Sequence, residues 1–208
     1  MFDDCTTIRS FLDSAAAKQP APGGGSVTAL VGALSASMGE MVVNYSVGKK
    51  GLEQHQPELK SAFGELHRAR HLLLRLMVED QLAYEALTAA KKLPQGTRDR
   101  EAKFAAALLA SINTPQAIAA TASAILALCD RLVDKVNFYL LSDLAVSADL
   151  AMAAVRCAVY NVRVNLPDVS DPAERQSFES SINQVLSHAA TVIQRVSPRI
   201  WARYAQGK

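Results

Sequence analysis

The stretch of residues 22–44, PGGGSVTALVGALSASMGEMVVN, decides how the rest of the chain is interpreted. Three glycines open it, small residues fill it, and Glu40 is its only charged residue. Because Gly25, Gly32 and Gly39 recur at intervals of seven, a helix here has a ridge with almost no side chains, which another backbone or a ligand can approach closely. A glycine turn that enters such a helix also leaves backbone N–H groups free at its positive end, where an anion or a carbonyl oxygen can bind.

The whole chain has the composition of a helical protein. Half of its 208 residues are apolar and only 6% are aromatic. Helix signals recur from end to end and no stretch alternates as a strand does, so we expect an all-α, single-domain bundle of about six to seven helices over residues 1–208. Beside the glycine-rich helix, the expected helices span residues 7–18, 57–92, 98–112, 115–135, 142–164 and 172–205.

Prolines set two of these boundaries. Thr114 and Asp171 each place a capping side chain directly before a proline, which favours the first position of a helix. The sequence therefore predicts that one helix ends near residue 112 and that a new one begins at Pro115.

Charge and cysteine usage exclude several classes of protein. The net charge is +2, and basic and acidic residues are interspersed, so we expect no nucleic-acid partner. Cys5, Cys129 and Cys157 show no paired spacing, which favours a reducing cytoplasm over a disulfide framework. The opening MFDDCTTIRS lacks the pattern of an export signal, and residues 26–43 owe their apolar character to small residues around Glu40, so we expect no membrane span.

Asp80 is the first candidate for chemistry. On a helical wheel of residues 57–92, Asp80 and Tyr84 share the sector of the apolar stripe, which consists of Leu59, Phe63, Leu66, Leu73, Met77 and Leu87. A carboxylate on a buried stripe is costly to ionise without a partner. Asp80 is therefore either held by a structural hydrogen bond, with Tyr84 or with the end of a neighbouring helix, or has a raised pKa that suits proton transfer.

The expected helix at 142–164 carries a second set of polar residues. Asp143 and Asn161 share one of its faces, and Asn165 lies beside them. Buried asparagines must be hydrogen-bonded, either to another helix or to a ligand with amide-like edges. Ser142 and Asp143 have a simpler alternative, as an N-cap and a first-turn acid.

Other signals in the sequence are weaker. Lys49 and Lys50 form either an anion-binding pair or a solvated loop pair. His67 and His71 have the spacing of a metal pair but lie off the apolar stripe, so we expect no metal site.

Several segments occur together in a recognisable order. They are APGGGS at 21–26, GKK at 48–50, ED at 79–80 with AY at 83–84, KLP at 92–94 with GT at 96–97, SDL at 142–144, and the stretch from Asn161 to Asn165 and Leu166. In this order they resemble the formiminotransferase-cyclodeaminase family, in particular its cyclodeaminase domain, which also includes stand-alone methenyltetrahydrofolate cyclohydrolases. The resemblance covers nearly the whole chain.

The resemblance implies a helical bundle that forms a homodimer, with a folate site near the subunit contact and no cofactor beyond the folate substrate. It implies either cyclodeamination of 5-formiminotetrahydrofolate to 5,10-methenyltetrahydrofolate and ammonia, or hydrolysis of that methenyl bridge. Asp80 is expected to transfer protons, with Asp143 as the second catalytic candidate. The expected substrate-binding residues, with the lysines favouring a polyglutamylated folate, are Gly23, Gly24, Gly25, Ser26, Lys49, Lys50, Tyr84, Asn137, Ser142, Asn161 and Asn165.

Three positions depart from the family pattern. Val136 and Tyr139 flank Asn137 where the family commonly has smaller residues, and Cys157 replaces a glycine. These substitutions keep open a further alternative, a non-catalytic helical dimer of the same family.

Overall fold

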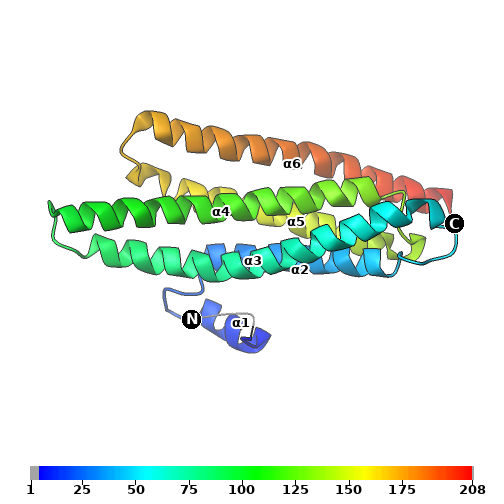
Figure 1. Ribbon diagram of the computed structural model, residues 1–208, viewed down its shortest axis with the longest axis horizontal. Coiled ribbons are helices and arrows are strands. Elements are labelled where there is room, and N and C mark those ends of the chain that lie inside the picture. Colours follow the sequence, from blue (N-terminus) through cyan, green and yellow to red (C-terminus); the bar gives the residue numbers. More distant parts are fainter. Residues whose placement is uncertain (1–4, 208) are drawn as a thin grey trace.

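The computed structural model describes residues 5–207, and this part of the chain forms six α-helices and three short 3-10 helices without a strand (Figure 1). The α-helices are α1 (Ile8–Ala16), α2 (Gly24–Asn44), α3 (Gln56–Lys91), α4 (Arg98–Leu132), α5 (Leu141–Arg163) and α6 (Pro172–Gln206). The 3-10 helices are Glu53–His55, Phe138–Leu140 and Leu166–Asp168. The expected all-α bundle is confirmed.

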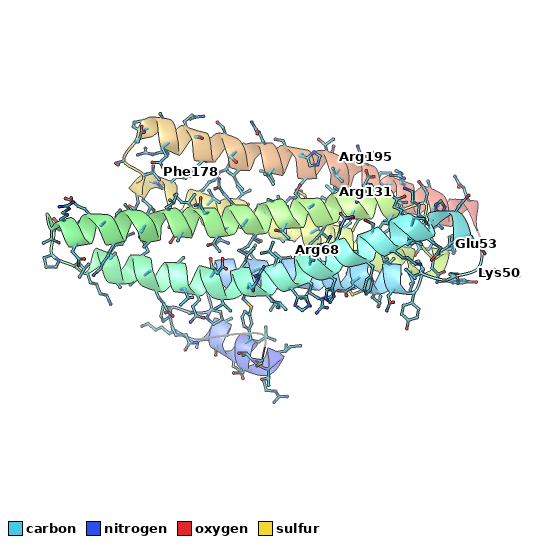
Figure 2. The ribbon with its side chains drawn as sticks, viewed as in Figure 1. Lys50, Glu53, Arg68, Arg131, Phe178 and Arg195 are labelled. Carbon is cyan, nitrogen blue, oxygen red and sulfur yellow. The ribbon has the colours of Figure 1, made fainter. Side chains whose placement is uncertain are left out.

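The long helices run side by side along one axis. α2 packs against α3 and α5, while α4 packs against α3, α5 and α6. In Figure 1, α3 and α4 lie in front of α2 and α5, α6 runs along the top, and α1 lies below the bundle. Figure 2 labels Arg195 on α6, whose guanidinium bonds Asp130 of α4 at 2.9 Å and ties the two helices together.

The predicted break at Pro115 is wrong, because α4 continues through it. A proline inside a helix removes the hydrogen bond to the carbonyl four residues earlier, which here belongs to Ser111. The side-chain amide of Asn165 donates to that carbonyl at 3.1 Å. A tertiary contact from beyond the end of α5 thus satisfies the carbonyl group that Pro115 leaves free.

The glycine row of α2 receives a matching row of side chains from α3. A methyl group built on Gly39 would meet Leu66, one on Gly32 would meet Leu73, and one on Gly25 would overlap the carboxylate of Asp80. Both rows have a spacing of seven and run in opposite directions. The close approach predicted from the glycines is therefore confirmed, and its last member is an acid instead of a leucine.

α2 and α5 also turn apolar side chains outward, and we call this surface the α2–α5 face. Each helix contributes a seam of exposed or half-buried residues at alternating spacings of four and three. The seam of α2 consists of Val27, Val31, Leu34, Met38, Met41 and Tyr45, and that of α5 consists of Val146, Leu150, Ala153, Cys157, Tyr160 and Val164. Water therefore reaches the seam residues of α5 as well as the exposed Asp149 and Arg163.

Three segments are long and apolar enough to cross a membrane by length and composition, namely Gly24–Asn44, Arg98–Leu132 and Phe138–Asp168. Between 44% and 61% of the apolar window of each is buried inside the bundle. The absence of a membrane span stays a prediction.

Candidate active site

A cleft of about 630 Å³ opens where α2 begins. Its walls come from the segment before α2, from the second half of α3, and from the end of α5 with the residues that follow it. Seven of the predicted site residues line it, namely Gly23, Gly24, Gly25, Asp80, Tyr84, Asn161 and Asn165.

Asp80 lies at the inner wall of the cleft, against the first turn of α2. Its carboxylate accepts a hydrogen bond from the Ser26 hydroxyl at 3.1 Å, and the Ser26 backbone N–H also donates to it. The Ser26 hydroxyl lies 3.2 Å from the carbonyl of Met77, one turn earlier on α3. Gly25 makes this position possible, since any side chain there would occupy the space of the carboxylate.

Burial raises the pKa of Asp80 above its ordinary value, although the hydroxyl and the backbone N–H of Ser26 oppose the shift. The expected partner Tyr84 is 48% exposed and forms no hydrogen bond with Asp80 in the described part of the chain. The structure thus supports both possibilities left open for Asp80, since its carboxylate is hydrogen-bonded to the start of the neighbouring helix α2 and burial raises its pKa.

Two amides form the wall opposite α3. The Asn161 side chain donates to the Thr28 hydroxyl at 3.2 Å, and its oxygen lies beside Gly24. The Asn165 side chain donates to the carbonyls of Ser111 and Asn161, at 3.1 and 3.0 Å. Since both amide nitrogens are engaged with the protein, both amide oxygens are left to accept hydrogen bonds from a ligand.

The first turn of α2 supplies donors to the same cleft. Gly23 is the N-cap and has no side chain to cap the helix, so the N–H groups of Gly24 and Gly25 lack a side-chain acceptor. These donors and the helix dipole favour a carbonyl or anionic oxygen at this position.

The structure adds residues to the cleft that the sequence analysis did not name. Gln81 is buried in its wall, and Lys91 forms an ion pair with Asp168 at 2.7 Å at its rim. Thr88 and Lys91 follow Tyr84 at helical spacing on one face of α3, so continuing the wheel beyond Tyr84 predicts both of them.

The remaining predicted residues lie at the other end of the bundle. Asp143 and Asn161 occupy the same helix 18 residues apart, which corresponds to about 27 Å. Lys49 and Lys50 lie in the loop after α2, and Figure 2 shows Lys50 at one end of the molecule and Phe178 toward the opposite end. A single site that holds all the predicted residues is therefore not assembled within one chain.

This second group has contacts of its own. The Asn137 side chain accepts from the backbone N–H of Tyr139 at 3.3 Å and caps a 3-10 helix. Lys49 lies over the ring of Tyr139 at 5.9 Å from its centroid. The N-cap of α5 is Leu140, so the predicted cap at Ser142 is wrong, whereas Asp143 does lie in the first turn.

Two other places on the molecule are weaker candidates for a site. A groove of about 770 Å³ between α3 and α4 is lined mainly by alanine and leucine, with Glu79 and Lys103 at its edges. It lacks the convergent polar groups of the cleft at Asp80. Within residues 5–207, no cluster of three or more metal-ligating side chains is found, and His67 bonds Glu40 at 2.9 Å.

Comparisons with known proteins agree with this description. A family model described as formiminotransferase-cyclodeaminase matches residues 7–184. A methenyltetrahydrofolate cyclohydrolase of Methylorubrum extorquens is 30% identical, over 91% of this chain and 93% of its own length. A formimidoyltransferase-cyclodeaminase of Sus scrofa is 31% identical over 95% of this chain, which spans 37% of that longer protein.

A solved structure is similar over nearly its full length. The crystal structure of formiminotetrahydrofolate cyclodeaminase from Thermotoga maritima superposes with a TM-score of 0.88 at 27% identity, and the match covers 95% of this chain and 97% of that one.

Proposed function

Because the chain belongs to the formiminotransferase-cyclodeaminase family, we propose that it converts 5-formiminotetrahydrofolate to 5,10-methenyltetrahydrofolate and ammonia. N10 of the folate attacks the formimino carbon and forms a new bond, and the bond from that carbon to the formimino nitrogen breaks. The departing nitrogen gains two protons, one given up by N10 and one supplied by solvent, and leaves as ammonia. The reaction therefore needs a group beside the folate that both accepts and donates a proton.

Asp80 is the observation that carries the proposal. A carboxyl group with a raised pKa can be protonated when the substrate binds, donate to the departing nitrogen, and then accept the proton of N10. The two hydrogen bonds from Ser26 fix its orientation against the first turn of α2. No metal and no covalent nucleophile enters these steps.

The rest of the cleft suits the pterin ring. Pterins present N–H groups along one edge, and the amide oxygens of Asn161 and Asn165 are acceptors for them. The N–H groups of Gly24 and Gly25 suit the pterin carbonyl oxygen. Tyr84 at the mouth offers an aromatic face to the flat ring.

Hydrolysis of the methenyl bridge is the second candidate. It is favoured by the Methylorubrum extorquens relative, a cyclohydrolase that this chain matches over 93% of its length. In that reaction water adds to the methenyl carbon and the bond from that carbon to N5 breaks, which gives the 10-formyl compound. Asp80 would accept one proton of the water and return it to N5, and the second proton is released to solvent when the formyl group forms, so the same residue serves both reactions.

A non-catalytic dimer is not favoured, since the three departures from the family pattern leave the cleft open. Val136 is fully buried in the core, Tyr139 lies at the far end of the bundle, and Cys157 is exposed on the α2–α5 face. None of them lines the cleft in the described part of the chain.

We further propose that the protein acts as a cytoplasmic homodimer. The two apolar seams of the α2–α5 face support this, since a water-exposed face of this kind favours a partner surface. A polyglutamylated folate, with Lys49 and Lys50 as the groups that bind its carboxylates, is proposed as the substrate form. No nucleic-acid partner and no cofactor beyond folate is proposed.

The ultraviolet absorbance of methenyltetrahydrofolate distinguishes the two reactions. Purified protein is supplied with the formimino compound in one cuvette and the methenyl compound in another, and ammonia is assayed in parallel. Enzyme-dependent gain of absorbance with ammonia release supports the cyclodeaminase, and loss in the second cuvette alone supports the cyclohydrolase. The proposal fails if neither changes and neither folate raises the melting temperature.

A further inference from the structure

Ser26 contacts Asp80 from inside the bundle. It is the third residue of α2, is only 1% exposed, and is not among the described residues that line the cleft. Its hydroxyl lies 3.1 Å from Asp80 Oδ2 and 3.2 Å from the carbonyl oxygen of Met77, and these two oxygens are its partners within residues 5–207. Ser26 can therefore act on a bound folate only through Asp80.

The Ser26 hydroxyl carries a single hydrogen atom. It cannot donate to the Asp80 carboxylate and to the Met77 carbonyl at the same moment, although both oxygens lie within bonding distance. The Met77 carbonyl also accepts the backbone N–H of Gln81 as a regular bond of α3, so it keeps a partner when the hydroxyl turns away. The hydroxyl thus has two acceptors for one hydrogen and reaches either of them by rotation about one bond.

The protonation state of Asp80 decides between the two acceptors. An ionised carboxylate only accepts, so the hydroxyl donates to it in a bond that the charge strengthens. A protonated carboxyl group has its own O–H, which donates to the Ser26 oxygen, and the hydroxyl hydrogen then turns to the Met77 carbonyl. In both states every polar hydrogen at this buried contact has an acceptor, so neither state has the cost of an unpaired donor.

The backbone N–H of Ser26 holds the carboxyl group during this exchange. It belongs to the first turn of α2, whose N–H groups have no acceptor within the helix, because the first helical bond runs from the Val27 N–H to the Gly23 carbonyl. Asp80 supplies an acceptor from α3. A carboxyl oxygen accepts this N–H in either protonation state, so Asp80 stays against α2 while its proton moves.

We propose that the Ser26 hydroxyl changes its partner with each proton transfer, from the Met77 carbonyl while Asp80 is protonated to the Asp80 carboxylate once the proton has passed to the departing nitrogen. This inference rests on the proposed function. Ser26 is then a positioning residue that lets one carboxyl group act first as an acid and then as a base. The exchange reverses when Asp80 accepts the proton of N10.

No other charged group in the described part of the chain sets the protonation of Asp80. The remaining titratable residues that line the cleft are Tyr84, Lys91 and Asp168, and the last two form an ion pair with each other at the rim. The cleft residues of α2, α4 and α5 are all neutral. Burial raises the pKa of Asp80 and the two Ser26 bonds oppose this shift, so the titration of Asp80 reports directly on Ser26.

NMR titration tests the exchange without any assay of turnover. The Asp80 carboxyl carbon, assigned by its loss in Asp80→Asn, is followed with pH in the wild type, Ser26→Ala and Ser35→Ala. Ser35 is the matched control, since it is a fully buried hydroxyl of α2 that donates to a carbonyl of α5 at 2.7 Å. We expect the midpoint to move to higher pH in Ser26→Ala, because the ionised form loses a donor, and to stay in place in Ser35→Ala. An unchanged or lower midpoint in Ser26→Ala overturns the proposal.

The carbonyl carbon of Met77 reports the other half of the exchange. In the wild type its resonance is expected to shift with the same midpoint as Asp80, because the carbonyl gains a hydrogen bond as Asp80 is protonated. In Ser26→Ala the hydroxyl is absent, so most of this shift should be lost. A Met77 resonance that does not follow Asp80 in the wild type, or that follows it equally in Ser26→Ala, contradicts the exchange of partners.

Turnover shows what the exchange contributes to the reaction. The free enzyme has to carry a protonated Asp80, so kcat/KM falls as pH rises through its pKa. Ser26→Ala is expected to lose about tenfold or more of the maximal rate and to move this falling limb to higher pH. Ser26→Cys, whose thiol is a weaker donor, should lie between Ser26→Ala and the wild type. Ser35→Ala should keep the position of the limb and, within about twofold, the rate.

The outcomes separate this inference from the proposed function. A Ser26→Ala variant that is slower but keeps the wild-type position of the limb has lost only a structural contact, and this result overturns the role of Ser26. A wild-type protein that turns over neither folate refutes the proposed function instead, while the NMR titrations of Asp80 and Met77 still decide whether the hydroxyl changes its partner.

Discussion

Replacing Gly25 by alanine tests how the bundle holds Asp80. The added methyl group would overlap the carboxylate, so Asp80 has to leave its position against the first turn of α2. The hydrogen bond from the Ser26 hydroxyl, 3.1 Å in the wild type, is then lost, and so is the bond from the Ser26 backbone N–H.

The expected size of the effect follows from these contacts. Loss of a hydrogen bond to a charged group costs about 1.5–3 kcal/mol, and alanine in place of a helical glycine returns at most about 1 kcal/mol. Because two such bonds are lost, the net destabilisation is about 2–5 kcal/mol, or about 4–20 °C in melting temperature for a chain of this length. Turnover should fall much further, by about 10²-fold or more, because the proton-transfer group is misplaced.

Gly32→Ala is the matched control. It lies in the same glycine row, but its methyl group would meet the ends of the Leu73 side chain at 3.1 and 3.2 Å, and this side chain can shift slightly. We expect a stability change within about 1 kcal/mol and turnover close to wild type. The assay is the rate of methenyltetrahydrofolate formation, with melting measured by circular dichroism. If Gly25→Ala turns over like Gly32→Ala, the account of how Asp80 is held is refuted.

Three further predictions concern stability and reactivity. Asp80→Asn removes a carboxyl group whose native pKa is raised; the wild type therefore loses stability as pH rises through that pKa, and the variant's advantage in melting temperature should be larger at pH 7 than at pH 4. An advantage that is equal at both pH values would contradict the raised pKa. Ser147→Ala removes the hydroxyl that donates to the Ser35 carbonyl at 2.8 Å and should lower the unfolding free energy by about 1 kcal/mol in urea titrations. Cys129 is buried and its pKa is raised to about 11 by that burial, so a thiol reagent at pH 8 should modify it only after unfolding; fast labelling in the native state would argue against the packing of α4.

The sequence supports a prediction of the bundle because its signals are local. The spacing of the α2 glycines predicted a close approach, and the structure shows Leu66, Leu73 and Asp80 filling it. Asp80 could be singled out because an acid on an apolar stripe is costly unless something compensates for it.

The predicted helix break at Pro115 is wrong because of a tertiary contact. Pro115 has the local pattern of a helix start, and only the amide of Asn165, which lies 54 residues after Ser111 in the sequence, shows why α4 continues. The separation of Asp143 and Asn161, in contrast, follows from the predicted helix at 142–164, because 18 residues of helix correspond to about 27 Å.

The role of Asp80 is tested most directly by comparing Asp80→Asn with Glu79→Gln. Glu79 is the neighbouring acid and faces the groove between α3 and α4 instead of the cleft. Turnover is measured from the absorbance of methenyltetrahydrofolate, and folate binding from the shift in melting temperature. The account predicts that Asp80→Asn loses about 10²- to 10⁴-fold in turnover while it still binds folate, and that Glu79→Gln behaves as the wild type. Turnover of Asp80→Asn within about threefold of wild type would contradict a proton-transfer role for Asp80.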